Sequence, residues 1–108
     1  SPLLRDGHFL QSWLVGCGGA LIEVHEDRGE ARITLDAGDE SFHACRIEAW
    51  QDGRKVSELP MTVQVNELRT FRFSYPAGAT RFRLYDGAIL VLDDAAADQS
   101  VVLWLDVV

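Results

Sequence analysis

Hydrophobic and polar residues alternate along most of this chain with a period of two. Successive side chains of a β-strand point to opposite faces, so this period is typical of strands that bury one face. Gly, Asp and Pro interrupt the alternation at short intervals, as expected of turns between short strands. The pattern predicts strands at residues 8–15, 20–26, 31–36, 42–50, 61–65, 68–75, 88–92 and 101–108.

The strongest turn signal is QDGR at residues 51–54. Asp52 and Gly53 readily adopt the positive φ angles that a two-residue hairpin turn requires. Such a turn pairs Trp50 with Lys55 and residue 49 with residue 56. The side chains expected to point inward are Cys45, Ile47, Ala49 and Val56.

The same register places Trp50 on the opposite face, beside Glu48 and Arg46. Pro60 lacks the N–H group that a strand ladder needs, so we expect it to end this pairing. Residues 61–65 are therefore counted as a separate strand.

The stretch FRFSYPAGATRFRLYDG, residues 71–87, alternates aromatic residues with arginines around a Pro-Ala-Gly turn. If residues 76–80 form a five-residue loop, core residues of one segment pair with solvent-facing residues of the other. A one-residue shift of register of this kind is costly, because it turns buried side chains towards water. A four- or six-residue loop avoids this mixing, as does placing the two segments in different sheets. Phe71, Phe73, Phe82 and Leu84 are then core, and Arg72, Arg81 and Arg83 point outward. If the two segments pair, Arg72 and Arg83 face one another.

Composition limits the class of protein. The chain has 108 residues, 47% of them hydrophobic and 25% charged, which are ordinary values for one globular domain. Its net charge of −7 argues against nucleic acid or an anionic membrane as the main partner, because both attract basic surfaces. We therefore expect residues 1–108 to form a single antiparallel β-sandwich of about eight or nine strands, with jelly-roll or immunoglobulin-like topology.

Trp50 is the main candidate for ligand binding. An outward-facing indole beside a polar turn is a platform on which sugar rings stack, and Glu48, Asp52 and Arg54 lie close enough to supply hydrogen bonds. In the simpler alternative a neighbouring loop or the aliphatic stem of Lys55 covers the ring. The other two tryptophans, Trp13 and Trp104, lie within apolar strands and are expected in the core.

Arg72, Arg81 and Arg83 form a second candidate site, for an anion or an acidic partner. The simpler interpretation is a solvated face crossed by surface salt bridges, which contribute little stability and are common. The chain has 17 acidic residues, enough to supply those bridges.

Two groups of acids are candidate calcium ligands: Asp93, Asp94 and Asp98, and Asp36, Asp39 and Glu40. Neither has the regularly spaced ligands and the glycine of a dedicated calcium loop, so we interpret both as solvated loop charge. We expect no metal ion and no other cofactor.

The two cysteines, Cys17 and Cys45, could form one disulfide or remain two thiols. We expect separate thiols, since a core of this size does not need a disulfide. No Ser, Cys or Thr stands in a strained glycine turn with a histidine nearby in sequence, so we expect no catalytic residue and no enzyme. We interpret the GCGG stretch around Cys17 as a flexible turn.

The stretch GDESFHACRIEAWQDG, residues 38–53, resembles the first motif of the cupin family, which binds a metal through two histidines and a glutamate. Cys45 stands in place of the second histidine. PAGATR resembles the second motif, with Arg81 in place of the last histidine. The resemblance implies at most His43, Cys45 and Glu48 as metal ligands, and strand parity puts Glu48 on the opposite face from the other two. The motif positions that match are Gly38, His43, Glu48, Gly53, Pro76 and Gly78.

Three functional hypotheses follow. The first is a non-catalytic module that recognises a carbohydrate or a related polar ligand through Trp50. The second is a structural domain that binds protein, or a second copy of itself, through the apolar strand that begins at Val101 and ends at Val108. The third is a degenerate cupin-like metal-binding domain.

Overall fold

The structure, a computed structural model, describes residues 8–14, 18–25, 28–39 and 41–95 of the chain. In these ranges it contains strands and turns and no α-helix, hence no helix that is long and apolar enough to cross a membrane. The strands are β1 (His8–Trp13), β2 (Gly19–His25), β3 (Glu30–Asp36), β4 (His43–Gln51), β5 (Arg54–Val63), β6 (Leu68–Ser74), β7 (Arg81–Asp86) and β8 (Ile89–Ala95).

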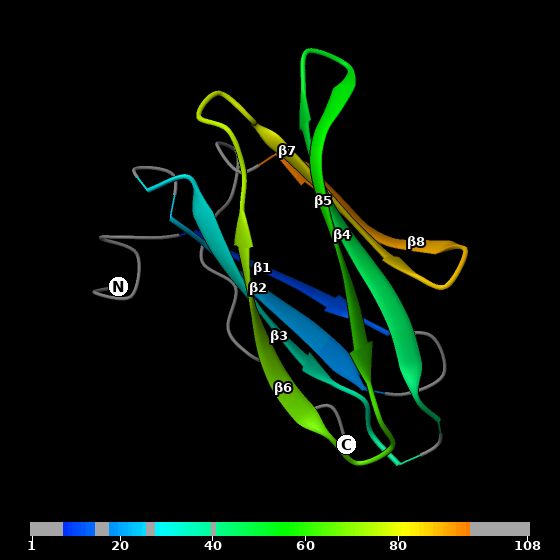
Figure 1. Cartoon of the computed structure of the whole chain (residues 1–108). Helices are drawn as coiled ribbons and strands as arrows, with labels where there is room; N and C mark the ends of the chain where they lie inside the picture. The colour runs from blue at the N-terminus through cyan, green and yellow to red at the C-terminus, as the bar shows by residue number, and fades with distance from the viewer. Residues whose placement is uncertain (1–7, 15–17, 26–27, 40, 96–108) are drawn as a thin grey trace.

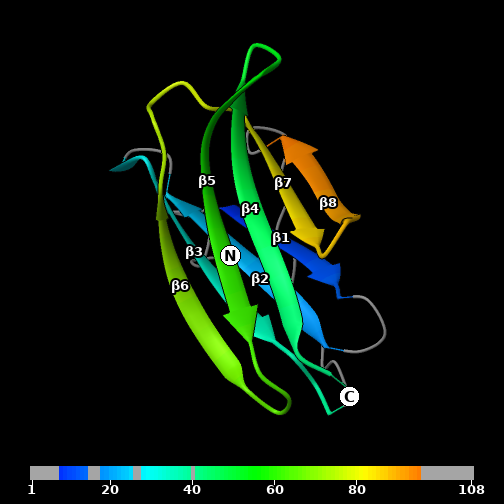
Figure 2. The ribbon, with the colours of Figure 1, turned by 45° about the vertical axis from the view of Figure 1, so that its right-hand side comes forward.

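The strands form two antiparallel sheets, as Figure 1 shows. One sheet has the order β1-β2-β3-β6 and the other the order β5-β4-β7-β8. The chain crosses between the sheets after β3, β5 and β6, while the remaining connections join neighbours in one sheet. Figure 2 shows the two sheets as separate layers. The all-β, antiparallel class predicted from the alternation is confirmed.

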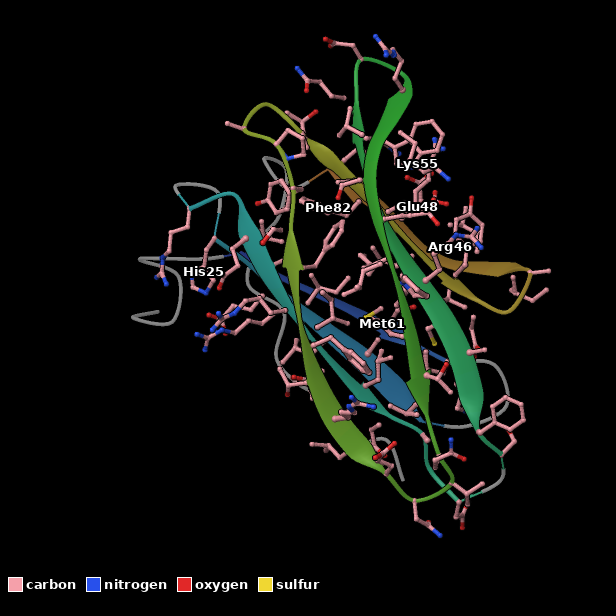
Figure 3. All side chains as sticks on the ribbon, viewed as in Figure 1. His25, Arg46, Glu48, Lys55, Met61 and Phe82 are labelled. Carbon is pink, nitrogen blue, oxygen red and sulfur yellow. The ribbon has the colours of Figure 1, made fainter. Side chains whose placement is uncertain are left out.

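One hydrophobic core lies between the sheets. Alternate residues of β2, β3, β4 and β7 point into it, as the period of two requires. In Figure 3 Met61 and Phe82 lie between the two layers. Phe73, Phe82 and Leu84 are buried as predicted, whereas Phe71 is partly buried at the edge of the core. The largest fully buried side chains are Phe82, Ile22, Ile33, Leu35, Ile47, Met61, Leu84, Val24 and Val63.

The β4–β5 hairpin forms as predicted at its turn. Asp52 and Gly53 have φ angles of 51° and 77°, and Trp50 pairs with Lys55. The next predicted pair is wrong: Ala49 lies opposite Ser57 because a β-bulge shifts the register between Ala49 and Trp50. Cys45, Ile47 and Ala49 are buried as expected, while Val56 is only partly buried against the core.

Pro60 does not end this hairpin. It lies within β5 opposite Arg46, and β5 continues to Val63. The proline is tolerated because, among the described strands, β5 lies at the edge of its sheet and pairs on one side only. Residues 54–63 are one continuous strand, so the separate strand expected at residues 61–65 is wrong.

The two arginine-bearing segments, β6 and β7, belong to different sheets. Arg72 therefore does not face Arg83, which lies opposite Glu48 and Asp93. The residue across from Arg72 is Arg32 on β3. The predicted last strand, with Trp104, lies outside the described residues.

Candidate functional site

The outward-facing side of β4 and β7 carries charged and aromatic side chains in direct contact. We call this surface the outer β4–β7 face; it consists of Arg46, Glu48 and Trp50 from β4 and of Arg83 and Tyr85 from β7. Strand parity puts the three β4 residues on one side, while Cys45, Ile47 and Ala49 point into the core. Figure 3 shows Arg46 and Glu48 on the side of β4 away from Phe82.

Glu48 lies at the centre of this face and is only 3% exposed. Its carboxylate accepts hydrogen bonds from Arg46 Nε at 2.8 Å and from Trp50 Nε1 at 2.9 Å. Lys55 Nζ lies 3.8 Å away. A buried carboxylate is costly unless it is paired and hydrogen-bonded, and here both conditions are met. Glu48 thereby fixes the positions of the Trp50 and Arg46 side chains.

Two cation–π contacts extend the arrangement across both strands. The Arg83 guanidinium carbon lies 4.2 Å from the centre of the Trp50 ring, and that of Arg46 lies 4.3 Å from the centre of the Tyr85 ring. One side of the indole is therefore covered by Arg83. Trp50 as a whole remains partly exposed.

Ion pairs border the face on both sides. Arg81 Nε donates to Asp93 at 2.6 Å, and Arg83 Nε lies 3.4 Å from the same carboxylate oxygen. The hydrogen bond from Arg81, with help from Arg83, lowers the pKa of Asp93. Across β5, Lys55 Nζ lies 2.5 Å from Glu58, which raises the pKa of Lys55 and lowers that of Glu58.

The predicted ligand-binding residues separate into two pairs. Glu48 and Trp50 are in direct contact, as predicted. Asp52 and Arg54 are exposed at the β4–β5 turn, where, among the described residues, they make no hydrogen bond or ion pair with that pair. The predicted arginine group also divides: Arg81 and Arg83 lie beside Asp93, and Arg72 lies on the other sheet.

The outer side of β3 and β6 holds an open surface pocket lined by Arg32, Thr70, Phe71 and Arg72. The two arginines are cross-strand partners and share the carboxylate of Glu30. Arg32 was missed from sequence because its pairing with Arg72 depends on β6 lying beside β3, forty residues later in the chain.

A buried polar cluster also escaped prediction. His43 Nδ1 lies 2.8 Å from an Asp86 carboxylate oxygen, and Nε2 donates to the Ala37 carbonyl at 3.1 Å. Cys45 is the cross-strand partner of Asp86. Burial, and after it the charge and hydrogen bonding of Asp86, raises the pKa of the Cys45 thiol to about 12. Cys45 is a free thiol that stays protonated near neutral pH, so it does not supply a thiolate nucleophile. Cys17 lies outside the described residues.

The metal ligands that the cupin resemblance implied are not brought together. His43 and Cys45 point into the core, and Glu48 lies on the outer β4–β7 face, as strand parity predicted. Across the described ranges, no group of three or more His, Cys, Asp or Glu side chains is placed to hold a metal ion. Among the candidate calcium ligands, Asp93 is paired with arginines, and the Asp36 carboxylate accepts a hydrogen bond from the Gly38 N–H at 3.0 Å. The structure does not describe Glu40, Asp98 or the side chain of Asp94.

Exposed apolar residues gather at one end of the molecule. We call this surface the apolar end. It comprises the five large hydrophobic side chains that are exposed in the described part of the chain, all of them on or next to the β3–β4, β5–β6 and β7–β8 connections. A hydrogen bond from the backbone N–H of Asn66 to the Gly38 carbonyl, at 2.6 Å, joins the β5–β6 and β3–β4 connections, and one from the Gly87 N–H to the Ala44 carbonyl, at 2.9 Å, joins the β7–β8 turn to β4. The five residues are Phe42, Val65, Leu68, Ile89 and Leu90.

Fold and sites together define an all-β, two-sheet domain with a preformed charged and aromatic surface on one sheet. Comparison with known proteins adds no family: no family model matches the chain, and neither a curated protein nor a solved structure is significantly similar to it.

Proposed function

We propose that the two sheets form an immunoglobulin-like sandwich rather than a jelly roll. In immunoglobulin domains strands B and E are neighbours in one sheet while C, F and G lie in the other. Placing β3 and β6 as B and E, and β4, β7 and β8 as C, F and G, reproduces that arrangement. The β5 strand then corresponds to the additional strand next to C in variable domains.

We propose further that this domain is a non-catalytic binding module that recognises a carbohydrate or a related polar ligand on the outer β4–β7 face. The supporting observation is the fixed position of Trp50, held by a hydrogen bond to Glu48 and by the stacked Arg83 side chain. A side chain that is already ordered loses little entropy when a ligand binds, so more of the contact energy appears as affinity.

The chemistry of the face suits a sugar. The apolar C–H side of a sugar ring stacks on the part of the indole that Arg83 leaves open. Asp52 and Arg54 follow Trp50 closely in the chain and supply an acceptor and donors for hydroxyl groups.

A glycan array tests this function directly. We expect the wild-type domain to bind a limited set of glycans and Trp50→Ala to lose them, with unchanged circular dichroism. Phe42→Ala is the matched control, since it removes an exposed aromatic ring from the opposite end of β4. Absence of glycan binding by the wild type, or full binding by folded Trp50→Ala, would refute the proposal.

A second candidate function is protein assembly, favoured by the apolar end. Its neighbourhood contains Asp36, Asp39 and Glu67, and no Lys or Arg occurs at the described positions 36–39, 41–45, 63–68 and 86–92. Charge complementarity therefore favours a protein partner that carries apolar and basic side chains, and disfavours a second copy of this acidic surface.

A peptide of alternating leucine and lysine serves as the probe for this alternative. It should bind the wild type, bind Leu68→Ser more weakly, and lose affinity as salt is added. Trp50→Ala should leave this binding unchanged, which separates the two candidate functions. Self-association of the wild type in place of peptide binding would contradict the proposed partner.

A further inference from the structure

The opposite sheet carries a pair of like charges that nothing in the proposed sugar-binding surface uses. Arg32 on β3 and Arg72 on β6 are directly paired in the antiparallel ladder. Directly opposite like charges destabilise a sheet unless another charge compensates them.

The compensation in the protein itself is incomplete. Among the described residues, the carboxylate of Glu30 is the one ion-pair partner of both guanidinium groups, with Oε1 at 3.9 Å from Arg32 Nε and at 3.6 Å from Arg72 Nε. Both distances exceed the usual length of a hydrogen bond. Glu23, the cross-strand partner of Arg32 on β2, is paired with His25. The Arg32 and Arg72 side chains are 49% and 66% exposed, so both are open to a ligand from solvent.

The two arginines also line a pocket with a hydroxyl group. The pocket is bounded by Arg32, Thr70, Phe71 and Arg72. Thr70 Oγ1 lies 2.9 Å from Thr34 Oγ1, and one of these hydroxyls donates to the other. The accepting hydroxyl retains its own hydrogen, so the pair has one further O–H to donate.

We propose that this pocket binds a tetrahedral oxyanion, of the phosphate or sulfate class. Two guanidinium groups supply charged donors, and the Thr70 hydroxyl supplies a third donor when it accepts from Thr34. A tetrahedral anion presents at least three acceptor oxygens to such a set. The anion removes the repulsion between Arg32 and Arg72, for which Glu30 compensates only in part. This site lies on the other sheet from the outer β4–β7 face, so the tests of the two proposals are independent of each other.

Calorimetric titration at low ionic strength, with inorganic phosphate, inorganic sulfate and acetate, tests the proposal. Phosphate and sulfate should bind more tightly than acetate, which presents only two oxygens. Arg32→Gln and Arg72→Gln should each weaken phosphate binding about tenfold, the loss expected for one charge-assisted contact.

Two further variants make the test specific. Glu30→Gln should tighten phosphate binding, because it removes the carboxylate that competes for both arginines. Arg28→Gln is the control: it removes the same charge from the β2–β3 turn, outside the pocket, and should leave binding unchanged. Thermal melts establish that each variant is folded.

Glycerol 2-phosphate distinguishes the source of the group. Binding equal to that of inorganic phosphate indicates a free ion as the ligand, and tighter binding indicates a phosphate ester; either result supports the oxyanion site. Three results would overturn it: no binding of phosphate or sulfate, acetate binding as tight as phosphate binding, or unchanged phosphate binding by folded Arg72→Gln.

Discussion

The guanidinium group of Arg83 lies over the indole ring of Trp50, with 4.2 Å between the guanidinium carbon and the ring centre. Arg83 pairs directly with Glu48, the residue that accepts the indole N–H, so the ring is oriented by two adjacent positions on neighbouring strands. Trp50, Arg83 and Glu48 therefore depend on one another for their positions, and the free energy of this coupling can be measured.

A double-mutant cycle with Arg83→Ala and Trp50→Ala measures this coupling. We expect the two changes to be non-additive by about 0.5–1 kcal/mol in the free energy of unfolding, as for a partly exposed cation–π contact. Urea denaturation of the wild type, both single variants and the double variant gives the value. Additive effects would show that the stacking contributes nothing to stability.

Glu48 should matter more to stability than the glutamate across from it. Glu48→Gln weakens the hydrogen bonds from Arg46 and Trp50 in a buried site, and should lower the free energy of unfolding by about 1–3 kcal/mol. Glu58 pairs with Glu48 across β4 and β5 but is exposed, so Glu58→Gln should have a much smaller effect. Equal effects in urea melts would mean that the burial of Glu48 carries no consequence.

Cys45 should make the domain less stable in alkali. Its pKa rises from 9.0 to about 12 on folding, so the folded state holds the thiol proton more tightly than the unfolded state does. This contribution is fully present below pH 9 and is lost as the pH rises towards 12. The difference in unfolding free energy between wild type and Cys45→Ala should therefore shrink across that interval. A difference that stays constant with pH would contradict the assignment.

The two sides of β6 should respond differently to truncation. Phe73 is 2% exposed and packs against Tyr75, with 6.0 Å between ring centres, so Phe73→Ala should cost about 3–5 kcal/mol. Arg72→Ala on the outer side should cost less than about 1 kcal/mol. Urea melts that reverse this order would show that the faces of β6 are wrongly assigned.

Period-two alternation was enough to tell which side chains of a strand share a face. It placed Phe73 and Ile47 in the core and put Trp50 beside Glu48, because alternation is a local property of the backbone. It could not show which strands are neighbours, since that depends on crossings between sheets. The Arg32–Arg72 pair and the contact between His43 and Asp86 were missed for that reason.

The burial of Glu48 on the outer face and the β-bulge that leaves Val56 of β5 unpaired had no sequence signal either. A glutamate on the solvent side of a strand is expected to be exposed, and here its neighbours' long side chains cover it. The prediction that Pro60 ends the hairpin was wrong because it did not allow for an edge strand, which tolerates a proline.

Pro60 also affects how the domain behaves towards other copies of itself. The free side of an edge strand is a template on which a foreign strand can assemble, and β5 is ten residues long. A proline interrupts the row of N–H donors that such an intruder would need, and the exposed charges of Lys55 and Glu58 make the same edge costly to dehydrate. The residue that misled strand prediction thus protects the folded domain against aggregation along β5.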